Sequence, residues 1–195
     1  MAGIRTFVAI PLEEEMHRQL ARLIDNLRES MPARAVRWVA PENIHLTLKF
    51  LGDVPPAQID AITEALRRAA STATPFSFEL VGFGCFPSAR RPRVLWVGIR
   101  ETSGSLQSLQ EAVEKELGQL GFKREERGFS PHLTLGRVRE EAPASAVREI
   151  GQLMEKLEFG VLGQQEVTSI HLFKSDLRPT GPIYTSLAEL PLRNP

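Results

Sequence analysis

The stretch from residue 44 to residue 50 alternates apolar and polar side chains and reads IHLTLKF. Because successive side chains of a β-strand point to opposite faces of its sheet, this alternation predicts a strand with one buried face. His45 and Thr47 share the polar face. The predicted core face consists of Ile44, Leu46, Leu48 and Phe50. The strand is therefore expected to hold an imidazole and a hydroxyl away from the core.

The same pattern returns at residues 131–138, which read PHLTLGRV. His132 and Thr134 again share one face, and Leu133 and Leu135 share the other. The two motif histidines are 87 positions apart. A pattern that returns at such a distance indicates an internal duplication.

The spacing of the other apolar residues predicts further strands and amphipathic helices. Strands are expected at residues 5–12, 76–86, 93–100, 165–174 and 184–190. Helices are expected at residues 13–30, 57–70, 103–120 and 142–157. Gly82 and Gly84 interrupt one of the strands, so a bulge or turn is expected there.

These elements follow the order strand, helix, motif strand, helix, strand, and the order then repeats. We therefore expect an α+β fold with two duplicated halves, roughly residues 1–90 and 91–195, packed as two lobes. Two mainly antiparallel sheets would face a central cleft, with the helices on the outside. No flexible linker separates the halves, so residues 1–195 are predicted to form a single bilobal domain.

The charge balance restricts the partners that the chain can take. Lys and Arg together number 24, as do Asp and Glu, so the formal net charge is zero. A protein that coats nucleic-acid duplexes needs many uncompensated cations, so this class is excluded. A small phosphate-bearing ligand in a local basic pocket remains compatible. We expect a monomer, because the charge is balanced and the repeat is self-contained.

Cysteine usage and hydropathy indicate the compartment. Cys85 is the single cysteine, which rules out an internal disulfide and fits a reducing cytoplasm. The first residues lack the apolar run of a signal peptide, and no stretch approaches the roughly 20 apolar residues of a membrane span. We expect a cytoplasmic protein that does not contact a membrane.

A single His-x-Thr tetrad is most simply a polar pair at a strand edge, but two copies in corresponding positions favour a functional site. A metal site is the other alternative. The sequence has no His-x-His pair, no HExxH motif and no cysteine cluster, and the tetrads contain no acidic residue. Zinc normally takes three or four nitrogen, sulfur or oxygen ligands. We therefore expect neither a metal nor a cofactor.

Two imidazoles that each have a threonine beside them suit phosphodiester chemistry. Imidazole titrates near neutrality, so one histidine can act as a base while the other acts as an acid. Cleavage of a phosphodiester needs both roles, because the attacking oxygen loses a proton and the leaving oxygen gains one. A threonine two residues along the strand lies roughly 6–7 Å away and can donate a hydrogen bond to a non-bridging phosphate oxygen. The pattern alone leaves open which histidine donates the proton.

The paired motifs resemble those of the 2H phosphoesterase superfamily. The finer resemblance is to the RNA 2′,3′-cyclic phosphodiesterase family, historically called 2′-5′ RNA ligases. It extends over nearly the whole chain and rests on RTFVAI, NIHLTLKFLG, FGCFPSARRPRVLWVG, SPHLTLGR and LFKSDLRPTGPIYTSL.

This resemblance implies hydrolysis of an RNA 2′,3′-cyclic phosphate to a 2′-phosphomonoester, without a metal or nucleotide cofactor. It implies that His45 is the general acid that protonates the departing 3′ oxygen and that His132 is the general base that activates water. Thr47 and Thr134 would hold the phosphate. Family members also join RNA ends through a 2′-5′ linkage. The alternatives are hydrolysis of small nucleoside or ADP-ribose cyclic phosphates, and a non-catalytic RNA-binding module.

Several arginines are candidates for substrate contacts. Arg137 lies five residues beyond the second motif histidine, on the opposite strand face if the strand stays regular. Gly136 could break that regularity and turn the guanidinium toward phosphate; an exposed strand-end arginine is the alternative. Arg91 and Arg93, with Arg90, form a basic patch that either binds phosphate or is a solvated loop.

Aromatic residues are candidates for stacking on a base. Tyr184 is the first choice, because it lies in the C-terminal stretch that carries the resemblance. Phe86 and Phe129 are further candidates, although either can belong to the core. Phe50 is a candidate too, but the alternation along its strand favours a place in the core.

The remaining histidines and the cysteine are not expected to act. His17 lies on a predicted helix rich in charge and is expected at the surface. His171 lacks a threonine two positions on and is expected to be structural. Cys85 is expected to be a small buried apolar residue.

Overall fold

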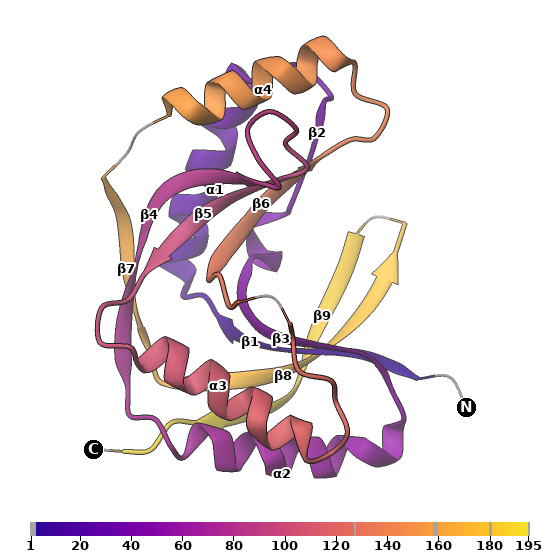
Figure 1. Cartoon of the computed structure of the whole chain (residues 1–195), viewed down its shortest axis with the longest axis vertical. Coiled ribbons are helices and arrows are strands. Elements are labelled where there is room, and N and C mark those ends of the chain that lie inside the picture. The colour runs from indigo at the N-terminus through magenta and orange to yellow at the C-terminus, as the bar shows by residue number, and fades with distance from the viewer. Residues whose placement is uncertain (1–2, 127, 158–159, 180, 195) are drawn as a thin grey trace.

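The two motif stretches form strands in different sheets, β3 (His45–Val54) and β6 (His132–Val138). The computed structural model describes residues 3–126, 128–157, 160–179 and 181–194. Each sheet belongs to a lobe of its own, as Figure 1 shows. All strand pairs within both sheets are antiparallel in the described residues. The predicted two-lobed α+β fold is therefore confirmed.

The first lobe, at the bottom of Figure 1, contains a sheet with the strand order β3-β1-β8-β9. Motif strand β3 lies at one edge, beside β1 (Ile4–Pro11). The sheet continues with β8 (Ser169–Arg178) and β9 (Gly181–Pro191). Helices α2 (Ile59–Ala70) and α3 (Ser105–Gly118) pack against each other and cover this sheet.

The second lobe contains a sheet with the strand order β2-β6-β5-β4-β7, so that motif strand β6 lies between two neighbours. Helices α1 and α4 pack against β7 and β4. The elements of this lobe besides β6 are α1 (Glu14–Ser30), β2 (Val36–Trp38), β4 (Phe76–Phe86), β5 (Val94–Arg100), α4 (Ala144–Lys156) and β7 (Val161–Val167).

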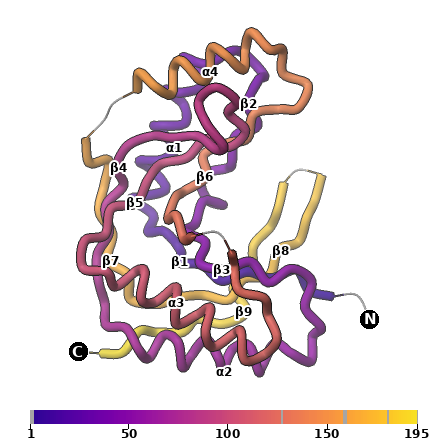
Figure 2. The backbone as a smooth tube through the Cα atoms, in the orientation of Figure 1, coloured from indigo at the N-terminus to yellow at the C-terminus, as the bar shows by residue number. Residues whose placement is uncertain are grey.

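The lobes do not coincide with the two halves of the sequence. Strands β2 and β4 come from the first half of the chain but belong to the sheet of the second lobe. Strands β8 and β9 come from the second half and complete the sheet of the first lobe. The tube in Figure 2 accordingly passes back and forth between the lobes.

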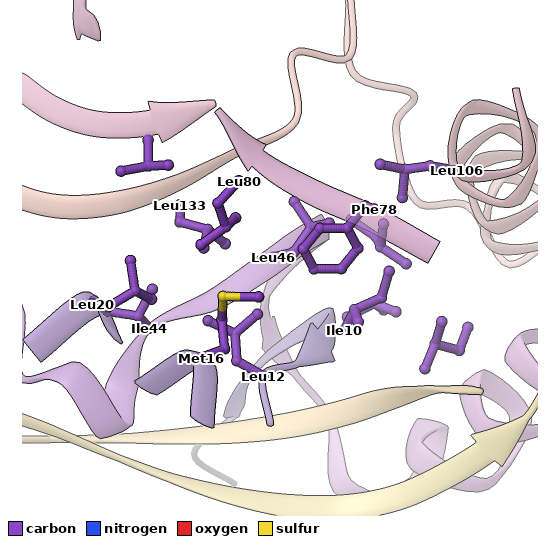
Figure 3. Close-up of a cluster of buried hydrophobic side chains, with 14 of the residues drawn as sticks. Ile10, Leu12, Met16, Leu20, Ile44, Leu46, Phe78, Leu80, Leu106 and Leu133 are labelled. Atoms are coloured by element: carbon purple, nitrogen blue, oxygen red, sulfur yellow. The ribbon is translucent and has the colours of Figure 1, made fainter. Parts of the chain in front are cut away.

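The apolar faces of the two motif strands share one core. Leu46 of β3 and Leu133 of β6 are fully buried in the same cluster, together with Phe78 and Leu80 of β4 (Figure 3). Met16 and Leu20 of α1 and Leu106 of α3 also contribute, so helices of both lobes pack on this cluster. Burial of a side chain of this size stabilises the fold by about 1.5–3 kcal/mol. The core therefore holds β3 and β6 in fixed positions relative to each other.

A β-bulge follows the threonine of the first motif. Ala9 pairs with Thr47, but the next residue pair joins Val8 to Lys49, which leaves Leu48 without a partner on β1. A bulge of one residue reverses the alternation of side chains beyond it. Lys49 is therefore buried.

The bulge also decides the position of Phe50, which is 66% exposed. The prediction that Phe50 belongs to the core is wrong, because the regular alternation on which it depends ends at Leu48. Phe50 instead lies on the face that carries His45, with its ring centroid 5.8 Å from that of Phe7.

The second motif strand has the corresponding bulge. Trp96 pairs with Thr134 and Leu95 pairs with Gly136, which leaves Leu135 without a partner on β5. Each of these residues is 87 positions beyond its counterpart in the first strand pair. The repeat seen in the sequence is thus a repeat of strand register, bulge included.

Most other predicted elements form within a few residues of their expected bounds, and the irregularity expected at Gly82 is a register shift in β4. The strand predicted at residues 165–174 is wrong, because the chain passes from one sheet to the other at Thr168. Val167 and Ile170 are both buried, so the apolar pattern continues across this break. In the described part of the chain, no helix has the length and apolar character needed to cross a membrane.

Candidate active site

His45 occupies the first position of β3, directly after a short 3₁₀ turn at Pro41–Asn43. Its Nδ1 lies 3.0 Å from the carbonyl oxygen of Asn43. Because a carbonyl only accepts hydrogen bonds, Nδ1 carries the proton of this bond. Nε2 is therefore the nitrogen left for a ligand. We call the face of each motif strand that carries histidine and threonine the motif face.

His132 is held in the same way at the first position of β6. Its Nδ1 lies 2.7 Å from the carbonyl oxygen of Ser130, again two residues earlier in the chain. The same tautomer follows, with Nε2 left for a ligand. The duplication thus presents two imidazoles with matched orientation relative to their strands.

Aromatic rings surround His45. The ring of Phe7 stacks on it with a centroid distance of 4.5 Å, and Tyr184 of β9 meets it edge-on at 5.1 Å. Burial lowers the pKa of His45 to about 4, although the hydrogen bond to the Asn43 carbonyl acts in the opposite direction. His45 is consequently neutral at neutral pH in the free protein.

The surroundings of His132 are aromatic as well. Phe86 meets the imidazole edge-on at a centroid distance of 5.0 Å, and Trp96 lies at 6.3 Å. A Cβ atom at Gly84 would overlap the indole of Trp96. Glycine at this position therefore allows the indole to lie against β4, with its ring centroid 5.2 Å from that of Phe86.

Thr47 and Thr134 are half-buried on the motif faces. Among the described residues, neither hydroxyl has a hydrogen-bond partner. Both can therefore donate to a ligand.

Tyr184 connects the two lobes electrostatically. Burial raises the pKa of its hydroxyl, and the positive charges of Arg5 and Arg137 oppose this effect. Arg137 belongs to β6 of the second lobe, whereas Tyr184 contacts His45 in the first. The charge of Arg137 therefore acts on a side chain that contacts His45.

The bulge at Leu135 explains the exposure of Arg137, because it reverses the alternation that would otherwise turn this side chain away from His132. The expected departure from regularity is thus present, one residue before Gly136.

A basic groove of about 500 Å³ lies beside Arg137. It is lined by Arg37, Arg93, Val94, Arg137, Val138, Arg139, Glu140 and Glu141. Arg93 is thus part of the groove, whereas Arg91 is an exposed loop residue whose amide donates to the Ser88 carbonyl and which does not line it.

Sequence reasoning missed Phe7, Trp96 and Arg37. The first two are next to motif residues only through strand pairing with β3 and β6. Arg37 pairs with Arg137 because β2 joins the second lobe, which no local pattern reveals. The 87-residue offset between the motifs was the available signal. It also separates their strand partners, since Ala9 pairs with Thr47 and Trp96 pairs with Thr134.

The other histidines have structural contacts. His17 is half-buried with its ring nitrogens 2.7 Å and 3.1 Å from the carbonyl oxygens of Pro41 and Leu12. The expectation of a surface residue is wrong, because α1 turns this side chain toward the 3₁₀ turn before His45. His171 contacts the hydroxyls of Ser169 and Ser186, which agrees with a structural residue.

Cys85 is expected to be a small buried residue, and Phe129 either to stack on a base or to belong to the core. Both side chains are half-buried against the core. In the residues that the structure describes, no three side chains of His, Cys, Asp or Glu are grouped so as to hold a metal ion. The protein's independence of metals stays a prediction.

The sequence model of the LigT-like phosphoesterases matches this chain twice, at residues 10–96 and 97–184. The chain belongs to the LigT-like phosphoesterase family. The two consecutive matches each contain one motif strand, in agreement with the duplicated register of β3 and β6. The resemblance to 2H phosphoesterases that the motifs carry is confirmed.

Relatives in this family cover almost the whole chain. An RNA 2′,3′-cyclic phosphodiesterase of Thermotoga maritima is 38% identical over 186 residues, which are 95% of this chain and 94% of the relative. The crystal structure of TT0787 of Thermus thermophilus has a TM-score of 0.79 and 29% identity, and covers 97% of this chain and 98% of that one.

A third relative has been solved with a nucleotide. The crystal structure of E. coli LigT complexed with 3′-AMP has a TM-score of 0.75 and 26% identity, and covers 97% of this chain and 98% of that one. The similarity between this chain and these relatives therefore extends over both lobes and both motif strands.

Proposed function

We propose that this LigT-like phosphoesterase hydrolyses the 2′,3′-cyclic phosphate at the end of an RNA strand to a 2′-phosphomonoester. The observation that carries the proposal is the matched pair of imidazoles. In each motif strand Nδ1 donates to the carbonyl two residues earlier, so that each Nε2 is left for a ligand, and we place one phosphate between them. The relatives named RNA 2′,3′-cyclic phosphodiesterase support the reaction and the substrate.

In the reaction, a water oxygen attacks phosphorus and the bond from phosphorus to the 3′ oxygen breaks. His132 Nε2 accepts the proton of the water, and His45 Nε2 delivers a proton to the 3′ oxygen. The hydroxyls of Thr47 and Thr134 donate to the non-bridging oxygens, where negative charge increases in the transition state. Neither a metal nor a nucleotide cofactor takes part.

The role of His45 as the acid requires a charge that the substrate supplies. In the free protein, the lowered pKa of His45 favours the neutral ring. A bound phosphodiester places a negative charge beside the ring, and an adjacent opposite charge favours the protonated form. Substrate binding therefore prepares His45 for proton donation.

The aromatic side of the site suits the base of the terminal nucleotide. Phe50 is largely exposed on the motif face, and Tyr184 adjoins His45. A base stacks on an exposed aromatic ring without sequence preference. We assign these residues to base contact, and Arg137 to contact with the scissile phosphate.

The test is incubation of a short RNA that ends in a 2′,3′-cyclic phosphate, in EDTA, with the product identified as a 2′- or 3′-phosphate. His45→Ala and His132→Ala should each reduce kcat by about 10²–10⁴-fold. His171→Ala is the matched control and should retain activity. A 3′-phosphate product would contradict the leaving group assigned to His45, and an active double variant would contradict the mechanism.

Two other activities use the same residues. A 5′-hydroxyl in place of water would give 2′-5′ ligation. Nucleoside or ADP-ribose cyclic phosphates would be small substrates of the same reaction. A non-catalytic RNA-binding module differs from both, because its RNA binding would survive loss of either histidine. We further propose that the enzyme acts as a monomer, which its balanced charge and self-contained repeat favour, in the reducing cytoplasm that its single cysteine fits.

A further inference from the structure

Two arginines of the basic groove lie directly opposite each other on neighbouring strands. Arg37 of β2 and Arg137 of β6 are partners in the antiparallel register. Residues paired in this way have side chains on the same face, and like charges there destabilise the sheet. Arg93 lies on the other side of β6, where its carbonyl accepts a hydrogen bond of 3.0 Å from the amide of Val138. Strands β2 and β6 and the residue just before β5 thus bring three positive charges to one groove.

Two glutamates line the groove beside these three charges. Arg139 pairs with Glu141 at 3.5 Å, and Glu140 also lines the groove. Within the described ranges of the chain, no carboxylate lies within ion-pair distance of Arg37, Arg93 or Arg137. A bound anion would remove the repulsion between the opposed guanidiniums, and arginine forms charge-assisted hydrogen bonds with phosphate.

The groove continues away from the scissile phosphate. Because of the bulge, Arg137 pairs with Val94, two residues along β5 from the partner of Thr134, which is roughly 7 Å at the rise of a β-strand. Arg37 lies one strand further out, on β2 at the edge of the sheet. A phosphate bound between Arg37 and Arg93 is thus a different phosphate from the one held by the threonines. A volume of about 500 Å³ also leaves room for the attached sugar.

We infer that the basic groove is a second phosphate subsite, in which Arg37 and Arg93 bind an internal phosphodiester of an RNA strand. This inference rests on the proposed function, because it assumes that the cyclic phosphate lies between the two motif faces. The subsite would make the enzyme prefer an RNA oligonucleotide over a mononucleotide as substrate. A mononucleotide cyclic phosphate leaves the groove empty, whereas an RNA oligonucleotide fills it.

The test compares two substrates, a tetranucleotide RNA that ends in a 2′,3′-cyclic phosphate and a nucleoside 2′,3′-cyclic phosphate. In the double variant Arg37→Gln/Arg93→Gln, kcat/KM on the tetranucleotide should fall by about 10- to 100-fold, the range for loss of charged hydrogen bonds. On the nucleoside substrate it should change by less than about 2-fold. Equal loss on both substrates, or no loss on the tetranucleotide, would overturn the inference.

The matched control removes the same charge elsewhere. Arg22→Gln/Arg148→Gln changes two exposed arginines of helices α1 and α4 in the same lobe. This variant should keep the wild-type ratio of kcat/KM between the two substrates. A similar loss of preference in the control would attribute the effect to long-range attraction and would also overturn the inference.

A third substrate separates an RNA phosphodiester from the diphosphate of a small molecule. ADP-ribose 1″,2″-cyclic phosphate carries a diphosphate that the groove could bind instead. Arg37→Gln/Arg93→Gln should leave kcat/KM on this substrate within about 2-fold of the wild type. Selective loss on it, with the tetranucleotide unaffected, would overturn the assignment to RNA.

A binding measurement keeps the subsite testable apart from the reaction. Affinity for the same tetranucleotide ending in a 2′-phosphate should fall with salt, and the slope of log K against log salt should decrease by about 0.7 in the groove variant, the value for one lost phosphate contact on a single strand. An unchanged slope would overturn the subsite. A wild type that shows this slope but hydrolyses no cyclic phosphate would instead contradict the proposed function.

Discussion

Phe50 and Arg137 occupy the same position in the two motif strands, five residues beyond His45 and His132 and just past equivalent bulges. Both side chains are exposed on the motif faces, but one is an aromatic ring and the other a cation. The duplicated register has thus diverged in chemistry at one matched site. We propose that Phe50 contacts a base of the substrate and that Arg137 contacts a phosphate.

Phe50→Ala tests the aromatic side of this division. We expect kcat/KM on the cyclic-phosphate RNA to fall by about 10-fold, because stacking on a base contributes about 1–3 kcal/mol. The free energy of unfolding should change by less than about 1 kcal/mol, since the ring is 66% exposed. Val161→Ala is the control for loss of an exposed apolar side chain, at 51% exposure on β7. Equal effects of the two substitutions on kcat/KM would refute the role of Phe50.

The pKa of His45 should respond to a bound phosphate. In the free protein, an NMR titration should give a value well below 6.5, near the value of about 4 that burial produces. Addition of 2′-AMP should raise it, because the phosphate charge stabilises the imidazolium. A pKa that does not rise with bound 2′-AMP would remove the basis for His45 as the acid and would favour exchanged roles for the two histidines.

The same lowered pKa predicts how stability depends on pH. Folding favours the neutral ring of His45. Its contribution to the free energy of unfolding is therefore fully present above about pH 6.5 and is lost as the pH falls toward about 4. Urea unfolding of the wild type and of His45→Gln, measured between these values, should show a steeper loss in the wild type. Parallel curves would mean that His45 has the same pKa in the folded and unfolded states.

Lys49 links the first motif strand to the segment that leads to the second. Its Nζ donates to the Glu114 carboxylate at 2.6 Å and to the Lys123 carbonyl at 2.8 Å. Lys49→Met should lower the free energy of unfolding by about 3–5 kcal/mol, because the buried carboxylate of Glu114 loses its cation. Lys49→Met/Glu114→Leu should recover most of this loss.

The control is the exposed pair of Arg18 and Glu14, whose side chains are 54% and 87% exposed. Arg18→Met should cost less than about 1 kcal/mol in the same urea experiment. If Lys49→Met cost no more than Arg18→Met, the buried pair would not hold the two segments together.

Gly84→Ala should disturb the second motif through Trp96. The added methyl group overlaps the indole, so we expect a loss of about 1–3 kcal/mol in stability and a change in tryptophan fluorescence. Gly118→Ala adds the same methyl group where no atom lies within 4 Å, and should be neutral or stabilising. Unchanged stability together with an unaltered emission spectrum in Gly84→Ala would show that the methyl group is accommodated without displacing the indole, and would contradict this prediction.

The sequence predicts the motif faces well, because alternation is a local property of a strand. It fails at Phe50, since a bulge depends on pairing with β1 and leaves no trace in the apolar pattern of β3. Lys49 illustrates the same limit: alternation assigns it to the motif face, but it is buried against Glu114, 65 positions away. The basic groove required the pairing of Arg37 with Arg137, which joins residues from opposite halves of the chain.

The exchange of strands between the halves has a consequence for motion. The chain passes between the lobes at six connections, around residues 11–14, 38–45, 70–76, 100–105, 118–132 and 167–169. A hinge needs a few residues that absorb the change in backbone angles, whereas here all six connections would have to change together. The two histidine strands are therefore preorganised, and the proposed RNA substrate would enter a site whose width is already set.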